Sequence, residues 1–266
     1  MGLSFRPSSS FSRLSPQEGA EPARPAIILG CANSYQDPHR QAQLVKERKG
    51  ISYLFRRSYP QRPVEILEEN PAERRFIFDL LRAQRYRWRS SMLHLAGYSE
   101  GDYIHLNGGL GEEPLKAKSL ATLISRLPGL KLVFLNGCAT AELVGHLLRL
   151  DLPAVIATQA RNSRTEATPT AMAFYEAMLR GRSLRQAFAR IQKVTPERLQ
   201  WQAAQYELQK DAFLFNGEPL PSHSETLLPG GLYYHCDRET DLDWAIPGSR
   251  PAAIRLSIDQ PKRIKV

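Results

Sequence analysis

The sequence of 266 residues has no long hydrophobic run and contains few cysteines. No stretch of about 18 consecutive apolar residues occurs, so we expect no segment that crosses a membrane. The three cysteines, Cys31, Cys138 and Cys236, are odd in number and lack the close spacing of zinc ligands. We therefore expect neither a disulfide framework nor a metal site, and this use of cysteine favours a reducing cytoplasm.

The two ends of the chain differ in composition from its middle. Residues 1–25 are rich in Ser, Arg and Pro and lack the apolar core of a secretory signal, so they are predicted to be a flexible leader. Residues 249–266 are interpreted as a linker and a basic tail. The residues between them, 26–248, are numerous enough to bury a full core and are expected to form one domain.

The chain is basic, with 36 Lys and Arg against 27 Asp and Glu and a formal net charge of +9. Such a balance permits contact with nucleic acid or with other anionic partners. Part of the positive charge lies in the arginines of residues 82–89, and part lies in the tail. No basic motif interleaved with aromatic residues supports a nucleic-acid interface. Nucleic acid is therefore not an expected partner, and the charge is interpreted as a solvated surface.

Short apolar runs alternate along the chain with segments of helical periodicity. This alternation predicts an α/β fold with a mainly parallel central sheet and helices on both of its faces. The predicted strands are 26–31, 64–67, 91–96, 102–106, 130–135, 153–158 and 230–234. The predicted helices are 41–57, 71–85, 117–126, 142–150, 168–180, 183–193 and 197–210.

The strand at 130–135 runs directly into Asn136-Gly137-Cys138, and a helix follows. Functional sites of open α/β sheets lie at the carboxyl ends of the strands, so Cys138 is a candidate nucleophile. A second strand ends at Gly97-Tyr98. If the two strands are parallel neighbours, Tyr98 and Cys138 share one edge of the sheet. Asn33 and Gln159 follow two further strands at the same edge.

Several stretches, in this order, resemble the CHAT domains, a caspase-like family related to cysteine peptidases. They are 26–33, 94–97, 132–140, 152–158, 173–190 and 231–233, with Trp244 and Pro247. The resemblance implies a caspase-like three-layer αβα sandwich that uses no cofactor. It also implies regulated cleavage of a protein or peptide substrate in bacterial defence or signalling, under the control of a partner protein.

The resemblance assigns roles to individual residues. Cys138 would be the nucleophile, the backbone amides of Cys138 and Ser99 would form the oxyanion hole, and Asn33 and Gln159 would border the substrate pocket. The catalytic histidine of the family follows the glycine of an H-x-x-G-H motif, and Tyr98 stands at that position here. Tyrosine has a reference pKa near 10 and is rarely a base at neutral pH.

Two other histidines are candidates for the missing base. His94 lies four residues before Tyr98, which is roughly 13 Å along a strand, so a buried and hydrogen-bonded role competes with a catalytic one. His105, on the next strand, would have to fold back toward the edge. Two functions remain open: an active cysteine endopeptidase, and a catalytically silent pseudopeptidase that serves as a protein-binding scaffold.

Overall fold

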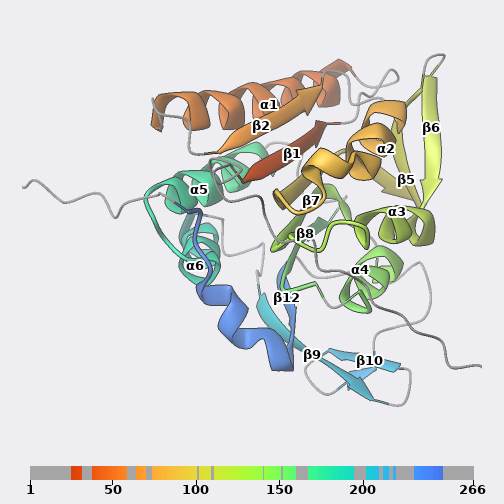
Figure 1. The fold of residues 1–266 in the computed structure, drawn as a ribbon, viewed down its shortest axis with the longest axis vertical. Coiled ribbons are helices and arrows are strands. Elements are labelled where there is room, and N and C mark those ends of the chain that lie inside the picture. Colours follow the sequence, from red (N-terminus) through yellow and green to blue (C-terminus); the bar gives the residue numbers. More distant parts are fainter. Residues whose placement is uncertain are drawn as a thin grey trace, which may run out of the picture.

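A nine-stranded, mainly parallel sheet runs through the computed structural model (Figure 1). The structure describes residues 25–31, 38–58, 64–69, 74–100, 102–108, 111–139, 141–150, 152–159, 167–194, 202–209, 212–215, 218–219 and 231–247. The predicted basic tail, the predicted leader apart from Pro25, and Asn33 lie outside these ranges.

The strand order is β11-β10-β9-β12-β8-β7-β3-β1-β2. The pairs β2–β1, β1–β3, β3–β7 and β7–β8 are parallel, and β12 runs antiparallel to β8. The predicted α/β class with a mainly parallel sheet is therefore confirmed. The strands are β1 (Ala26–Cys31), β2 (Glu65–Glu69), β3 (Ser90–Ala96), β7 (Leu132–Ala139), β8 (Val155–Gln159), β9 (Gln202–Gln209), β10 (Ala212–Phe215), β11 (Glu218–Pro219) and β12 (Gly231–His235).

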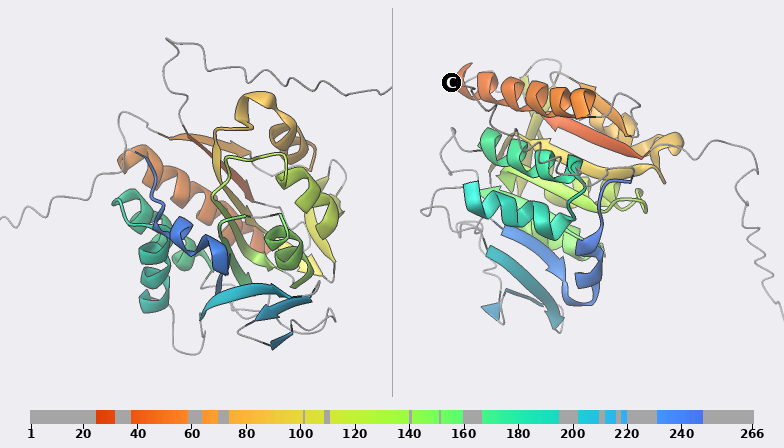
Figure 2. Two further views of the ribbon diagram at one scale, coloured as in Figure 1. Left: turned by 60° about the horizontal axis from the view of Figure 1, so that its bottom comes forward. Right: turned by 90° about the vertical axis from the view of Figure 1, so that its left-hand side faces the viewer.

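Helices cover both faces of this sheet (Figures 1 and 2). One face carries α1 (Pro38–Ser58), α5 (Ala167–Leu179) and α6 (Leu184–Val194), and the other carries α2 (Arg74–Arg82), α3 (Ala117–Ile124) and α4 (Ala141–Leu148). Short 3-10 helices, η1 (Gln84–Tyr86) and η2 (Cys236–Asp243), follow α2 and β12. Among the described residues, no helix combines the length and the apolar character needed to cross a membrane.

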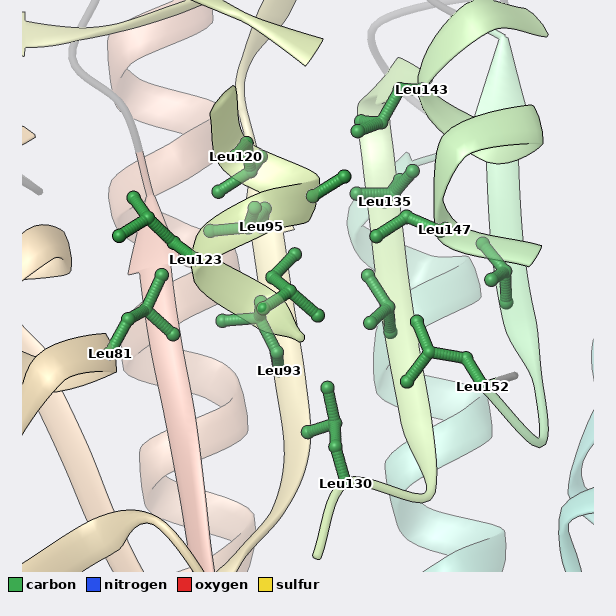
Figure 3. Packing of buried hydrophobic residues seen from close by; sticks show 14 of the residues in the cluster. Leu81, Leu93, Leu95, Leu120, Leu123, Leu130, Leu135, Leu143, Leu147 and Leu152 are labelled. Carbon is green, nitrogen blue, oxygen red and sulfur yellow. The ribbon is translucent and has the colours of Figure 1, made fainter. Parts of the chain in front are cut away.

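Side chains of the central strands alternate between the two faces of the sheet, so each face has its own hydrophobic core. In β1, Ala26 and Ile28 pack toward the α2–α4 face, whereas Ile27 and Leu29 pack toward the α1–α5 face. Fully burying an aliphatic side chain of this size contributes about 1.5–3 kcal/mol. Figure 3 shows leucines of β3 and β7 meeting leucines of α2, α3 and α4 on the first of these faces. Burial on both sides explains why these strands read as continuous apolar runs.

The helix predicted over residues 197–210 is wrong, because the structure has strand β9 there. β9 pairs in parallel with β12 and antiparallel with β10. Its sequence, Gln-Ala-Ala-Gln-Tyr-Glu-Leu-Gln, carries residues with good helix propensity. Pairing with strands distant in the sequence overrides that local preference, since strand formation depends on its neighbours more than on intrinsic propensity.

A small antiparallel sheet follows β3. It consists of β4 (Tyr98–Glu100), β5 (Tyr103–Gly108) and β6 (Gly111–Lys116), of which the sequence predicted only the middle strand. A single residue, Gly97, separates the end of β3 from the start of β4, and β4 contacts β7. The hairpin of β4 and β5 therefore extends the carboxyl end of β3 alongside the strand that contains Cys138.

Candidate functional site

The carboxyl ends of β1, β3 and β7 lie side by side. Ala96 of β3 pairs with Cys31 of β1 on one side and with Asn136 of β7 on the other. Cys138 belongs to the last part of β7, and Gln159 is the last residue of β8, where it pairs with Ala139. Cys31 is buried, with an exposed fraction of 3%. The strand ends at which the sequence predicted site residues therefore lie along one edge of the sheet.

A sharp backbone irregularity precedes Cys138. Gly137 has a φ of 73°, in the left-handed region that favours glycine, and the pairing of β7 with β8 shifts register between Leu135 and Ala139. A Cβ atom at Gly137 would lie 3.2 Å from the carbonyl oxygen of Gly97. The Gly97 amide in turn donates to the carbonyl oxygen of Asn136, at 3.2 Å. The chain thus turns out of the regular ladder immediately before the cysteine, against the junction between β3 and β4.

A buried polar cluster lies directly beneath this turn, with the Glu47 carboxylate of α1 at its centre. One oxygen of Glu47 is 2.8 Å from Nε2 of His94 and accepts a hydrogen bond from Nδ2 of Asn136 at 2.6 Å. The exposed fractions of Glu47, His94 and Asn136 are 2%, 0% and 2%. Removing a carboxylate from water is costly unless it is hydrogen-bonded, and these contacts supply the partners.

The cluster reaches the backbone next to Cys138 through Thr158 of β8. The Thr158 hydroxyl donates to Oδ1 of Asn136 at 3.0 Å and accepts a hydrogen bond from the Gly137 amide at 2.5 Å. The amide group immediately before the candidate nucleophile is therefore held by a buried side chain. Through Asn136, this contact connects the turn to Glu47.

Tyr175 of α5 closes the other end of the cluster. Its hydroxyl lies 3.1 Å from Nδ1 of His94, and its ring packs against Phe55, Phe134 and Phe174. Burial raises the pKa of Tyr175 well above its usual value of 10, and the nearby Glu47 adds to the effect. A protonated hydroxyl is able to donate a hydrogen bond to Nδ1, and the other ring nitrogen, Nε2, faces Glu47.

We call this set of side chains, Glu47, His94, Asn136, Thr158 and Tyr175, the polar centre. Both ring nitrogens of His94 have partners in it. The structure thus places His94 within the core, with both ring nitrogens hydrogen-bonded. This agrees with the buried, hydrogen-bonded role that was one of the two interpretations of its position in the sequence.

Tyr98 lies opposite His105 in the β4–β5 hairpin. The two ring centroids are 5.1 Å apart with an interplanar angle of 40°, and both side chains are half-buried. Directly opposed residues of an antiparallel pair project from the same face. His105 therefore folds back beside Tyr98, an arrangement that the sequence left open.

Ser99 belongs to the opposite face of this hairpin. It pairs with the core residue Ile104, and its exposed fraction is 7%. Within the part of the chain that the structure describes, its hydroxyl oxygen has no hydrogen-bond partner. Of the proposed oxyanion-hole and pocket residues, Ser99 lies beside Tyr98 on β4, whereas Asn33 lies outside the described residues.

Four members of the polar centre were not predicted from the sequence. Glu47 carried a signal, because it stands at helical spacing between Leu44 and Ile51 on the buried face of α1. A carboxylate in an apolar stripe points to a buried partner. Asn136 and Thr158 lay at strand ends already singled out, but Tyr175 reads as an ordinary core aromatic residue.

The described ranges contain no group of three His, Cys, Asp or Glu side chains arranged to hold a metal ion. In a comparison with known families, the model of the CHAT domain matches residues 3–242. None of the curated proteins compared with the chain matches it. The matched range contains every residue of the edge described above.

Proposed function

Because the chain belongs to the CHAT domain family, which is caspase-like and related to peptidases, we propose that it is a cysteine endopeptidase module with Cys138 as its nucleophile. The α/β sandwich is the fold of that family. The position of Cys138 supports the proposal, since it follows a left-handed glycine at the carboxyl end of β7. Sites of parallel α/β sheets lie at this end.

The observation that carries the proposal is the pairing of Tyr98 with His105. The family places an imidazole where this chain has Tyr98, and the hairpin brings the His105 ring to a centroid distance of 5.1 Å from the Tyr98 ring. We infer that His105 supplies the displaced imidazole and that the Tyr98 hydroxyl passes a proton between it and the thiol. Histidine titrates near neutral pH and suits both directions of this transfer.

The proposed reaction proceeds in two steps. The thiol of Cys138 loses its proton toward His105, its sulfur forms a bond to the scissile carbonyl carbon, and the carbon–nitrogen bond breaks as the protonated imidazole gives its proton to the leaving amine. Water then attacks the resulting thioester, releases the carboxylic acid and restores the thiol. The backbone amides of Cys138 and Ser99 would stabilise the oxyanion in both steps.

The wider role is also a proposal. Asn33 and Gln159 would border the substrate pocket, and neither is acidic, so a basic residue is not the expected side chain before the scissile bond. The substrate would be a protein or peptide, cleaved in the cytoplasm as part of a bacterial defence or signalling system. A regulatory partner protein would control the cleavage.

One observation favours a second function. Tyr98 occupies the histidine position of the family, and a phenol with a reference pKa near 10 is a poor base at neutral pH. If His105 does not reach the thiol, the edge is catalytically silent and the domain serves as a protein-binding pseudopeptidase.

The test is covalent labelling with a peptidyl chloromethyl ketone at neutral pH, read out by mass spectrometry of each cysteine. The proposal expects Cys138 to react much faster than Cys31 and Cys236, and the Cys138→Ala variant to lose the fast phase. Equal labelling of Cys138 and a denatured-chain control would contradict an activated thiol.

The Tyr98→His variant separates the two functions. In a pseudopeptidase the native chain is inert and this variant gains labelling at Cys138. In the active enzyme, the native chain already reacts.

A further inference from the structure

A basic and aromatic surface lies at the end of β3 opposite the candidate site. The segment between α2 and β3 reads Arg85-Tyr86-Arg87-Trp88-Arg89, preceded by Arg82, and contains no acidic residue. The expectation that the chain lacks a basic motif interleaved with aromatic residues overlooked this segment. Ser90 follows it and begins β3, so seven strand residues, roughly 20 Å, separate it from Gly97.

Trp88 is the most exposed large hydrophobic side chain among the described residues, with an exposed fraction of 72%. Tyr86, two residues earlier, is 5% exposed. Trp88 thus keeps most of its indole in solvent, whereas the neighbouring Tyr86 is buried in the core. Trp88 is therefore available for stacking.

Three arginines of this stretch each contact an aromatic ring. The Arg87 guanidinium carbon lies 5.8 Å from the centroid of Trp88, that of Arg85 lies 4.6 Å from Tyr86, and that of Arg82 lies 5.2 Å from Phe78. All three arginines are exposed. Side chains already ordered by cation–π contacts lose less conformational entropy when a ligand binds.

These three arginines keep their charge available. Arg89 of this segment forms an ion pair with Glu65. Among the described residues, no carboxylate pairs with Arg82, Arg85 or Arg87. The arginine fork matches the oxygens of a phosphate group. This stretch of the chain therefore carries three exposed guanidinium groups and one exposed indole, and the Arg87 guanidinium lies against that indole.

The backbone beneath this surface is fixed. The Ala26 amide donates to the Arg89 carbonyl at 2.7 Å, which ties the segment to β1. A Cβ atom at Gly129 would lie 2.4 Å from the Trp88 carbonyl oxygen, so the turn before β7 packs directly against the backbone of the segment. A rigid support preserves the spacing of the side chains.

We propose that the surface of Arg82, Arg85, Arg87 and Trp88 binds single-stranded nucleic acid. Each nucleotide of a single strand offers a phosphate for a guanidinium and a base for the indole, and proteins that bind such strands combine basic grooves with aromatic stacking. The net charge of +9 attracts a polyanion at long range. An acidic peptide would pair with the arginines but offers no regular partner for Trp88. The bases of a duplex are already stacked on one another and are not available to the indole.

The experiment is a fluorescence anisotropy titration of the full chain with a labelled oligothymidylate of about 16 nucleotides, within the site sizes common for single-strand binding. We expect Trp88→Ala to weaken binding about tenfold. Replacing Arg85 and Arg87 by Ala should lower the slope of log affinity against log salt by about 0.7 for each phosphate that the variant no longer neutralises. Because these side chains are exposed, the thermal midpoint should not change.

Two controls keep the test specific. Arg190→Ala, an exposed arginine of α6, should bind like the native chain. A variant with Lys262, Arg263 and Lys265 replaced by Ser should also retain binding, because the proposal does not involve the tail.

Three outcomes would overturn the proposal: no binding at low salt, binding that Trp88→Ala leaves unchanged, or binding abolished by the tail substitutions. Equal competition by polyglutamate would assign the surface to acidic proteins and would also overturn it. None of these measurements depends on Cys138, so the proposed peptidase activity can fail or hold independently.

Discussion

His94 and His105 flank the same strand end, but their surroundings differ. His94 is fully buried, and both of its ring nitrogens have hydrogen-bond partners in the polar centre. His105 is half-buried on the β4–β5 hairpin, where it faces Tyr98. Exchanging a proton with a substrate requires a nitrogen that can give up its partner, and doing so inside a dry core leaves a buried group unsatisfied. The difference supports our proposal that His105, and not His94, transfers the proton, while His94 belongs to the buried hydrogen bonds beside the turn.

The largest expected effect comes from His105→Ala. If His105 supplies the imidazole, the rate of acylation of Cys138 by a peptidyl chloromethyl ketone should fall about 10²–10⁴-fold, the usual contribution of general acid–base catalysis. The free energy of unfolding should fall by only about 1 kcal/mol, the usual effect of a single substitution, because His105 is half-buried. Urea unfolding and stopped-flow labelling measure the two quantities. An unchanged rate of acylation would remove the distinction between the two histidines.

Glu47→Ala should mainly lower the free energy of unfolding, and it should affect the proton transfer proposed for His105 less. It leaves Nε2 of His94 and Nδ2 of Asn136 without their acceptor, and each buried donor left unsatisfied costs about 1–3 kcal/mol. Urea unfolding at constant m-value measures the loss. The matched control is Glu176→Ala, which removes a carboxylate paired with Arg180 on the surface of α5 and should cost about 0.5 kcal/mol. Similar losses in both variants would show that the polar centre adds little stability.

The smallest expected effect is a change in the alkaline limb of stability in Tyr175→Phe. Burial raises the pKa of Tyr175 in the folded chain, whereas an unfolded tyrosine ionises near pH 10. Above that pH the unfolded chain releases a proton that the folded chain retains, so the free energy of unfolding falls as pH rises. Phenylalanine removes the proton from both states and should make the slope shallower by up to about 1.4 kcal/mol per pH unit.

The slope should not vanish, because burial also raises the pKa of Tyr233. Tyr53→Phe serves as the control, since Tyr53 is 58% exposed and no comparable burial acts on it. The measurement is the urea midpoint between pH 9 and about pH 11, around the reference tyrosine pKa. A Tyr175→Phe slope equal to that of the native chain would be at odds with a protonated, buried phenol.

The sequence predicted those parts of the fold that depend on short local patterns. The apolar runs of β1, β3 and β7 were recognised because strands buried on both faces have little choice of composition. The strand-end position of Cys138 followed from the same pattern, and the register that places Gly97 beside Asn136 agrees with the expected neighbour relation. The expectation that Tyr98 stands where the family has a histidine came from the resemblance and stays a prediction.

The polar centre lay beyond such reasoning, because it depends on contacts between residues far apart in the chain. Glu47 is 47 residues from His94 and 89 from Asn136, and Tyr175 is 81 residues from His94. Local periodicity carries no information about which buried carboxylate meets which imidazole. The same limit explains β9, whose strand state is set by β12 and β10 rather than by its own residues.

The position of Tyr175 within the chain has a consequence for synthesis on the ribosome. The polar centre joins α1, made early, to α5, made more than a hundred residues later. A nascent chain that has extruded β7 already contains Cys138, but it lacks the phenol that completes the hydrogen bonding of His94. Domains fold as units as they emerge. The turn before Cys138 therefore gains all the hydrogen bonds of the polar centre only after α5 has been translated. Until then, a newly made chain already contains Cys138 but lacks part of the structure that supports the turn.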